Sequence, residues 1–252
     1  MCRKKSILKT GLTFMACVLA PFLMARAALC QLANEESLVQ DYMVGHPQDF
    51  NQLGRYHATD ELLKAQPPEP NRVVFLGDSI TDLWNLAQFF PGKPYVNRGI
   101  GGQTTPQMLV RMFQDVIDLK PSAVIILAGT NDIGQNTGPE TATMVEGNFQ
   151  AITELAQMHD IKVILCLLTP INDYTKYKWP VHRPPSDILK LNAWLRDYAA
   201  RAHVGLADYY SAVVDEKGML RQNCSNDGIH PNATGYELMA PVAESAIEKA
   251  LQ

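Results

Sequence analysis

The sequence has few cysteines, no excess of basic residues and no apolar run of the roughly 20 residues that a membrane span needs. Five cysteines among 252 residues are too few for the disulfide framework of small secreted domains. Lysine and arginine number 22 against 26 aspartates and glutamates, which gives a net charge of −4. This balance argues against nucleic acid or an anionic membrane surface as a partner.

Signals for a metal or a nucleotide cofactor are also missing. The six histidines stand at no spacing, with cysteine or with paired carboxylates, that is typical of a metal site. The loop glycines Gly99, Gly101 and Gly102 lack the complete dinucleotide-binding fingerprint. We therefore expect neither a metal nor a cofactor, and any chemistry must come from side chains.

The first residues, MCRKKSILKTGLTFMACVLAPFLMARAALCQ, place a basic stretch before a short apolar run and the motif Ala-Arg-Ala. This layout is typical of a secretory signal peptide over residues 1 to 27, cleaved after Ala27. The alternative is an uncleaved anchor, for which the apolar run is short. Leu29 stands where a lipid-anchored protein needs a small residue, so we do not expect lipidation at Cys30. The sequence predicts a secreted or periplasmic protein without stable membrane insertion.

Signal cleavage would change both the charge and the cysteine content. It removes five basic residues and no acidic ones, so the net charge falls from −4 to −9. Cys30, Cys166 and Cys224 remain, and three cysteines permit one internal disulfide at most. The mature chain is therefore acidic and depends little on disulfides.

Short apolar runs alternate with segments of helical period along most of the chain. The runs predict buried strands at residues 73–76, 95–97, 123–127, 162–168 and 204–207. Apolar residues at helical spacing predict helices over residues 105–120, 139–160, 186–202 and 233–252. The alternation favours an α/β fold with a mainly parallel sheet and helices on both faces, formed by residues 71–252. Residues 28–70 are interpreted as a tail, a helix over 50–66 and a stiff PPEP linker.

Groups suited to ester hydrolysis follow the predicted strands. Ser79 follows the first strand, Gly102 the second and Asn131 the third, and Asp227 and His230 lie near the carboxyl terminus. The ligand site of an open parallel sheet lies outside the carboxyl ends of its strands. A serine nucleophile needs a base, which His230 can supply, and a group that fixes the tautomer of the base, which Asp227 can supply. The amides of Ser79, Gly102 and Asn131 can form an oxyanion hole.

Each of these residues also has an ordinary structural interpretation. Ser79 could simply cap the helix that follows its strand, and Asn131 could be a turn residue. The neighbouring carboxylates Asp78 and Asp132 are interpreted as caps or loop-fixing groups, because Asp227 already supplies the orienting carboxylate. The joint placement of the five candidate residues at strand ends favours the catalytic interpretation.

The segments GDSIT, NRGIGGQT, GTND and DGIHP resemble the four sequence blocks of the SGNH, or GDSL-type, hydrolases, in the family's order over residues 73–235. The resemblance implies a three-layer, flavodoxin-like sandwich whose five-stranded parallel sheet has the order 2-1-3-4-5. It also implies the same triad and the same oxyanion hole. Within the family, the GIGG loop and the HPNA run resemble platelet-activating-factor acetylhydrolase-like members and secreted bacterial esterases.

Three further residues are candidates for binding the substrate. Arg98 stands beside the oxyanion glycine and could bind a polar head group. Tyr174 and Trp179 belong to the long segment 171–187, which is either a lid or acyl-side wall or a solvated loop with a few packed aromatic residues.

The sequence thus predicts a serine esterase or acylhydrolase that cleaves carboxylic esters, with short O-acyl groups on a small molecule, carbohydrate or lipid as the favoured substrates. A lysophospholipase or an acyl thioesterase of the same fold is an alternative. A non-catalytic module that binds carbohydrate is the alternative from another class, and it predicts a degraded triad. The oligomeric state is not predicted.

Overall fold

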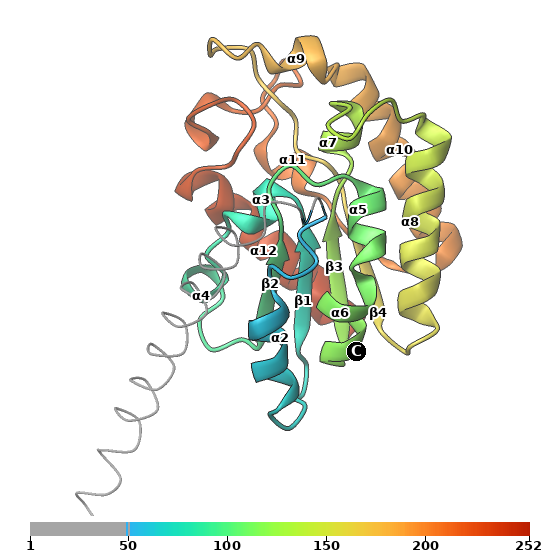
Figure 1. The fold of residues 1–252 in the computed structure, drawn as a ribbon. Coiled ribbons are helices and arrows are strands. Elements are labelled where there is room, and N and C mark those ends of the chain that lie inside the picture. The colour runs from blue at the N-terminus through green and yellow to red at the C-terminus, as the bar shows by residue number, and fades with distance from the viewer. Residues whose placement is uncertain (1–48, 50) are drawn as a thin grey trace, which may run out of the picture. The chain divides into compact units, whose positions relative to one another are not determined.

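The computed structural model describes Asp49 and residues 51–252, so the predicted signal peptide and Cys30 lie outside the described residues. The chain divides after Thr59 into two compact units, of which the second holds the sheet (Figure 1). The helix expected over 50–66 is shorter in the structure, where α2 spans His57–Lys64; Gln52, with a φ of 54°, lies outside the helical region, and turns separate it from α2. Within the described part of the chain, no helix combines the length and the apolar character that crossing a membrane requires.

Five parallel strands form one sheet in the order β2-β1-β3-β4-β5, which confirms the predicted topology. They are β1 (Val73–Gly77), β2 (Tyr95–Gly99), β3 (Ala123–Leu127), β4 (Lys162–Cys166) and β5 (Gly205–Ala207). β1 pairs with strands on both sides, so that Val74 lies between Val96 and Val124. Every residue of β1 and β3 is buried, as expected for a parallel sheet with both faces covered.

Beyond α2, the described helices fall into long ones that cover the sheet and short ones that are spread around it (Figure 1). The long ones are α8 (Ala142–Gln157), α10 (Pro185–Ala202) and α12 (Ala233–Ala250). The short ones are α3 (Ser79–Asp82), α4 (Leu86–Phe89), α5 (Thr105–Val110), α6 (Met112–Asp115), η1 (Ile117–Leu119), α7 (Thr130–Ile133), α9 (Trp179–His182), α11 (Tyr209–Val213) and η2 (Gln222–Cys224).

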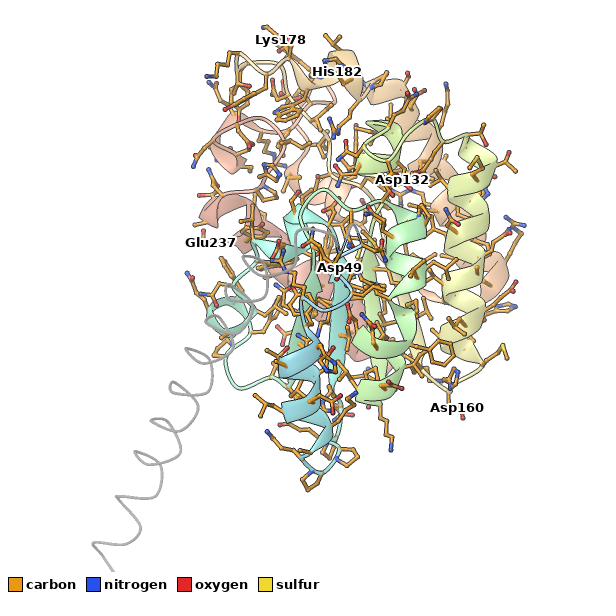
Figure 2. The ribbon with its side chains drawn as sticks, viewed as in Figure 1. Asp49, Asp132, Asp160, Lys178, His182 and Glu237 are labelled. Carbon is orange, nitrogen blue, oxygen red and sulfur yellow. The ribbon has the colours of Figure 1, made fainter. Side chains whose placement is uncertain are left out.

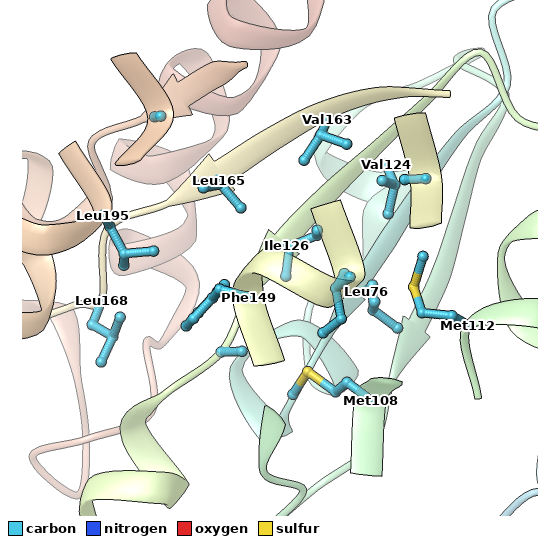
Figure 3. Packing of buried hydrophobic residues seen from close by; sticks show 14 of the residues in the cluster. Leu76, Met108, Met112, Val124, Ile126, Phe149, Val163, Leu165, Leu168 and Leu195 are labelled. Atoms are coloured by element: carbon cyan, nitrogen blue, oxygen red, sulfur yellow. The ribbon is translucent and has the colours of Figure 1, made fainter. Parts of the chain in front are cut away.

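Two hydrophobic clusters, one on each face, hold the helices to the sheet. Side chains alternate between the faces of a strand, so Val74 and Leu76 belong to one cluster and Val73 and Phe75 to the other. The first cluster includes Met108 from α5, Met112 from α6, Phe149 from α8 and Leu195 from α10 (Figure 3). The second cluster includes Leu86 from α4, Val213 from α11 and Met239 from α12. The result is the expected three-layer sandwich.

The prediction of a single helix over residues 105–120 is wrong. The chain there forms α5, α6 and the 3₁₀ turn η1, with an interruption at Arg111, whose ψ is 6°. Arg111 is fully buried, and its guanidinium donates to the carbonyl oxygens of Arg98 at 2.7 Å and of Gly77 at 3.0 Å. The break therefore coincides with a side chain that reaches the ends of two strands.

The carboxyl ends of β1 and β3 are neighbours, although β2 lies between them in the sequence. This is the point at which an open α/β sheet binds its ligands. α3 begins directly after β1, and α7 begins shortly after β3, so both helices start at this edge. In Figure 2, Asp132 of α7 and His182 of α9 lie beyond this edge, whereas Asp160, which precedes β4, lies at the opposite end.

α3 can lie close to β2 because Gly99 has no side chain. A Cβ atom there would lie 2.1 Å from the backbone nitrogen of Asp82. Only glycine permits that approach, because the neighbouring atoms are backbone and cannot move aside. The close packing fixes the position of α3, and with it the position of Ser79.

Candidate active site

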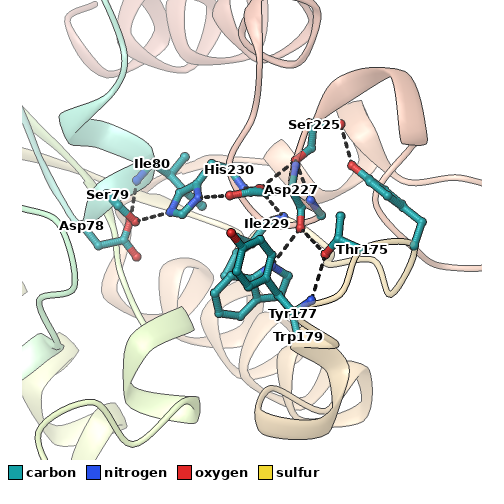
Figure 4. Close-up of polar contacts among 12 residues, drawn as sticks. Asp78, Ser79, Ile80, Thr175, Tyr177, Trp179, Ser225, Asp227, Ile229 and His230 are labelled. Carbon is teal, nitrogen blue, oxygen red and sulfur yellow. Dashed lines mark hydrogen bonds and ion pairs between the residues drawn. The ribbon is translucent and has the colours of Figure 1, made fainter.

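Ser79 is the first residue of α3 and is only partly buried. The helix is capped by the preceding residue, because Asp78 Oδ1 accepts a hydrogen bond from the amide of Ile80 at 2.9 Å. Ser79 Oγ instead lies 2.9 Å from Nε2 of His230, which is 151 positions away along the chain (Figure 4). Asp78 therefore caps α3, and the hydroxyl of Ser79 contacts His230 instead of capping the helix.

Asp227 and His230 form one compact turn. Nδ1 of His230 lies 2.6 Å from Asp227 Oδ2. The other carboxylate oxygen, Oδ1, accepts hydrogen bonds from the amides of Ile229 at 3.0 Å and His230 at 2.9 Å. The spacing of three residues thus lets one carboxylate bind the ring and the backbone that carries it, which fixes the imidazole toward Ser79 (Figure 4).

The hydrogen bonds to Asp227 favour its charged form. Partial burial raises the pKa of this carboxyl, but the bonds from the ring and amide of His230 and the amide of Ile229 outweigh burial, so the pKa lies below its ordinary value. A carboxylate only accepts hydrogen bonds, so Nδ1 of His230 carries the proton that it donates. In the neutral ring, Nε2 is then the acceptor for the hydroxyl of Ser79.

The segment 171–187 braces the loop that carries Asp227. The hydroxyl of Thr175 and the indole nitrogen of Trp179 both donate to the carbonyl of Asp227, at 3.0 Å and 2.9 Å. The hydroxyl of Tyr174 donates to the carbonyl of Ser225 at 2.5 Å. The polar atoms of Tyr174 and Trp179, the two aromatic residues that the sequence suggested for substrate binding, are therefore bonded to this loop (Figure 4).

The groups expected to form the oxyanion hole are gathered at the same edge. A Cβ atom at Gly101 would lie 3.8 Å from the Cβ of Ser79, so the loop after β2 lies beside the serine. Gly102 has a φ of 79°, a left-handed conformation that glycine adopts readily. Asn131 is buried in α7, and its Nδ2 donates to the carbonyl of Gln103 at 3.1 Å.

The structure places the side chain of Arg98 away from this cluster. Arg98 is 4% exposed, and its guanidinium donates twice to Asp60 Oδ1, at 2.9 Å and 2.5 Å. A third bond, at 2.6 Å, goes to the carbonyl of Asn97. A buried arginine held by a carboxylate cannot reach a substrate head group, so we no longer propose Arg98 as a substrate-binding residue.

Asp78 and Asp132 are buried carboxyls with ordinary structural bonds. Asp132 Oδ1 accepts from the amide of Thr105 at 2.9 Å, which ties α7 to the start of α5. Burial raises the pKa of Asp132 to about 7, against the bonds from Thr105. Burial also raises the pKa of Asp78 to about 6, although its capping bond and its electrostatic interactions with His230 and Arg183 lower that pKa. These contacts agree with the interpretation of both residues as caps or loop-fixing groups.

Among the residues that the structure describes, no three histidine, cysteine or acidic side chains form a group that could hold a metal ion. Cys166 and Cys224 are both buried and unpaired. The polar groups that the structure gathers at the site are a hydroxyl, an imidazole, a carboxylate and amides.

Sequence reasoning missed Arg183, which contacts the site from the segment 171–187. Its Nη2 lies 3.2 Å from Oδ1 of Asn131. Nothing in the sequence links the two residues, because they are 52 positions apart and share no element or spacing. The length of the segment 171–187 is the only sequence feature that points to this region.

Comparison with known proteins agrees with this geometry. Residues 75–238 match the GDSL-like Lipase/Acylhydrolase family. The chain belongs to this family. The GDSL family comprises acylhydrolases and esterases, so the resemblance read from the four sequence blocks is confirmed.

Individual similar proteins differ in how much of the chain they share. The crystal structure of a GDSL-like lipase from Bacteroides thetaiotaomicron is 36% identical, with a TM-score of 0.73, and the match covers 81% of this chain and all of that one. Platelet-activating factor acetylhydrolase IB subunit alpha2 of Rattus norvegicus is 26% identical over 180 residues, 69% of this chain and 75% of that protein. The uncharacterized lipoprotein YqeF of Bacillus subtilis is 30% identical over 139 residues, 49% of this chain and 57% of YqeF.

The raised pKa of Asp78 predicts that its ionisation weakens the fold as the pH rises. A carboxyl whose pKa is higher in the folded than in the unfolded state stabilises the fold below the unfolded value, near 4, and loses that contribution as the pH passes the folded value, about 6. Asp78→Asn keeps a capping acceptor but cannot ionise. The free energy of unfolding of Asp78→Asn minus that of the parent should increase by about 2 to 3 kcal/mol from pH 4 to pH 7.5, as measured by urea titration at each pH.

Asp208→Asn is the matched control, because Asp208 caps α11 in the same way. Partial burial raises the pKa of Asp208, but the bonds from Ser211 and Arg196 lower it below the ordinary value. This carboxylate stabilises the fold above the unfolded pKa and loses that effect as the pH falls, so the Asp208→Asn difference should change in the opposite direction. An Asp78→Asn difference that is the same at both pH values would contradict the raised pKa.

Proposed function

We propose that the protein is a serine esterase that cleaves short-chain carboxylic esters with Ser79 as nucleophile, His230 as general base and Asp227 as orienting carboxylate. The observation that carries the proposal is the unbroken series of contacts from Asp227 to His230 at 2.6 Å and from His230 to Ser79 at 2.9 Å. Both distances lie within the hydrogen-bond reach that proton transfer needs.

In the first step, Ser79 Oγ attacks the acyl carbonyl carbon while Nε2 of His230 takes the hydroxyl proton. The carbonyl oxygen becomes an oxyanion, for which the amides of Ser79 and Gly102 and the side-chain amide of Asn131 are the donors. Asp227 stays ionised and stabilises the imidazolium, which its lowered pKa favours. The imidazolium then protonates the leaving alcohol, and an acyl group remains on Ser79.

In the second step, water takes the place of the alcohol. His230 removes a proton from the water, whose oxygen attacks the acyl carbon, and the same donors hold the second oxyanion. The carboxylic acid leaves as Ser79 recovers its proton from His230. Nε2 of His230 takes part in every transfer: it takes a proton first from Ser79 and later from water, and it gives one first to the leaving alcohol and later to Ser79, so no other acid or base is required.

The aromatic pair beside Asp227 supports an alcohol portion that is a ring, such as an O-acylated sugar. Tyr177 and Trp179 stack with centroids 5.3 Å apart and planes at 24°, and Tyr177 is 52% exposed. Trp179 is fixed by its bond to the carbonyl of Asp227, so the pair has a defined place next to the triad. Flat aromatic faces bind apolar ring surfaces and leave hydroxyl groups in water.

We also propose that the chain is exported, with cleavage after Ala27. The basic stretch and short apolar run at the amino terminus support export, as does the likeness to YqeF, which is named a lipoprotein. The intact mass of protein exported by a bacterial host should correspond to a chain that begins at Ala28. Retention of Met1, or a lipid attached to Cys30, would contradict this assignment.

Replacing the nucleophile tests the mechanism. Ser79→Ala should lower the turnover of a short-chain aryl ester by at least about 1,000-fold, because the remaining groups supply only residual catalysis. The melting temperature should change little, since Asp78 rather than Ser79 caps α3. A fluorophosphonate probe should label the parent at Ser79 and leave the variant unlabelled. A parent that resists the probe would favour a non-catalytic carbohydrate-binding module instead.

The acyl preference is tested with p-nitrophenyl esters of increasing chain length, beside an acetylated polysaccharide and a lysophospholipid. We expect kcat/KM to be highest for acetyl and to fall with chain length, and we expect release of acetate from the polysaccharide. Tyr177→Ala should raise the KM for the acetylated polysaccharide and leave that for the acetyl aryl ester unchanged. A preference for long acyl chains or for the lysophospholipid would make the protein a lysophospholipase, and a preference for thioesters would make it a thioesterase.

A further inference from the structure

The guanidinium of Arg183 is enclosed at the carboxyl edge of the sheet. Arg183 directly follows α9 and is only 7% exposed. Its Cζ lies 5.3 Å from the ring centroid of Trp179, and a Cβ atom at Gly134 would lie 2.6 Å from the same carbon. The guanidinium therefore fills a space that has the Trp179 ring and the Gly134 backbone beside it. Such a space suits a planar cation better than the flexible ammonium of lysine.

Arg183 donates three hydrogen bonds there, all to α7 or to the turn that follows it. Nε donates to the carbonyl of Thr130 at 3.1 Å. Nη2 donates to Oδ1 of Asn131 at 3.2 Å and to Oδ1 of Asn136 at 3.0 Å. One side chain from the segment 171–187 thus holds two separate side-chain amides.

The bond to Asn131 decides which way its amide faces. A guanidinium has donors and no acceptor, so only the amide oxygen can be turned toward it. Nδ2 of Asn131 must then point to the opposite side, where it lies 3.1 Å from the carbonyl of Gln103 and 3.4 Å from Asp78 Oδ2. That side is the one next to Ser79, because Asp78 directly precedes it.

The bond to Asn136 affects Gly102, the second proposed donor of the oxyanion hole. Asn136 accepts from Arg183 through Oδ1 and donates from Nδ2 to the carbonyl of Gly102 at 3.1 Å. Gly102 has the left-handed φ of 79° that orients its peptide groups. A single guanidinium therefore reaches Asn131 directly and Gly102 through one intervening amide.

We propose that Arg183 is a positioning residue for the oxyanion hole, which orients the amide of Asn131 and, through Asn136, fixes the backbone of Gly102. This inference rests on the proposed esterase function. It adds that the segment 171–187 supports transition-state stabilisation, a role distinct from that of a lid. Arg183 itself does not touch the reacting atoms, so its effect must pass through the two amide groups.

The test is a double-mutant cycle between Arg183 and Asn131, measured with an acetyl aryl ester. Arg183→Met should lower kcat by about 10- to 100-fold with little change in KM, because oxyanion donors act in the transition state. Asn131→Ala alone should lower kcat by about 100- to 1,000-fold. In the Asn131→Ala background, Arg183→Met should lower kcat by only about threefold or less, since only the part of its effect that passes through Asn136 and Gly102 remains.

Arg183→Lys keeps the charge and one donor, and it should recover part of the kcat lost in Arg183→Met. Arg196→Met is the matched control, because it also removes a hydrogen-bonded guanidinium, in this case one that pairs with Asp208 on the outer surface of α10. Its kcat should equal that of the parent. If Arg183→Met fails to fold, the cycle is run with Arg183→Lys, for which the same loss of additivity is expected.

The side-chain amide resonances of Asn131 in nitrogen-15 spectra give a readout that does not depend on turnover. They should shift in Arg183→Met and remain unchanged in Arg196→Met. Equal losses of kcat in both Asn131 backgrounds, or an unshifted Asn131 amide, would overturn the role of Arg183. A parent that neither hydrolyses esters nor reacts with a fluorophosphonate would instead overturn the proposed function, and the amide shift would still decide whether Arg183 orients Asn131.

Discussion

The hydrogen bond between Ser79 and His230 is the contact on which the rest of the site depends, because it joins residues 151 positions apart. It forms only if the loop before α12 returns to the carboxyl end of β1. The sheet order makes that return possible by placing β1 between β2 and β3. The close approach of α3 to Gly99 then fixes the serine at the edge where the imidazole arrives.

The carboxyls near this contact differ in how their surroundings shift their pKa. Asp78 and Asp132 both lose hydration on burial, which raises the pKa of each. Asp227 is the exception, because the hydrogen bonds that it accepts hold its pKa below the ordinary value. The two fully buried carboxyls secure loops, and the third pairs with an imidazole. Asp227 differs from them in both respects, because it is less buried and accepts hydrogen bonds from Ser225, Ile229 and His230.

The segment 171–187 supports the site from two directions. Thr175 and Trp179 bond to the carbonyl of Asp227, and Arg183 bonds to the amide of Asn131. These bonds connect the loop of the triad to the loop of the proposed oxyanion donor through one stretch of chain. Opening it as a lid would break all of them, so the contacts favour a fixed support over a moving cover.

Apolar periodicity predicted the strands, and four motif blocks indicated the family, because both are features of short stretches of sequence. The sheet order was implied by the resemblance to that family, and the structure confirms it. The sequence also placed Ser79 and Asn131 just after the first and third strands, where the structure has them. The hydrogen-bond partners of two arginines, in contrast, depend on the tertiary structure: Arg98 pairs with Asp60, and Arg183 bonds to Asn131. The partner of an arginine depends on which distant carbonyls and carboxylates the folded chain brings within about 3 Å. The periodicity of the sequence carries no information about which of these partners an arginine will meet.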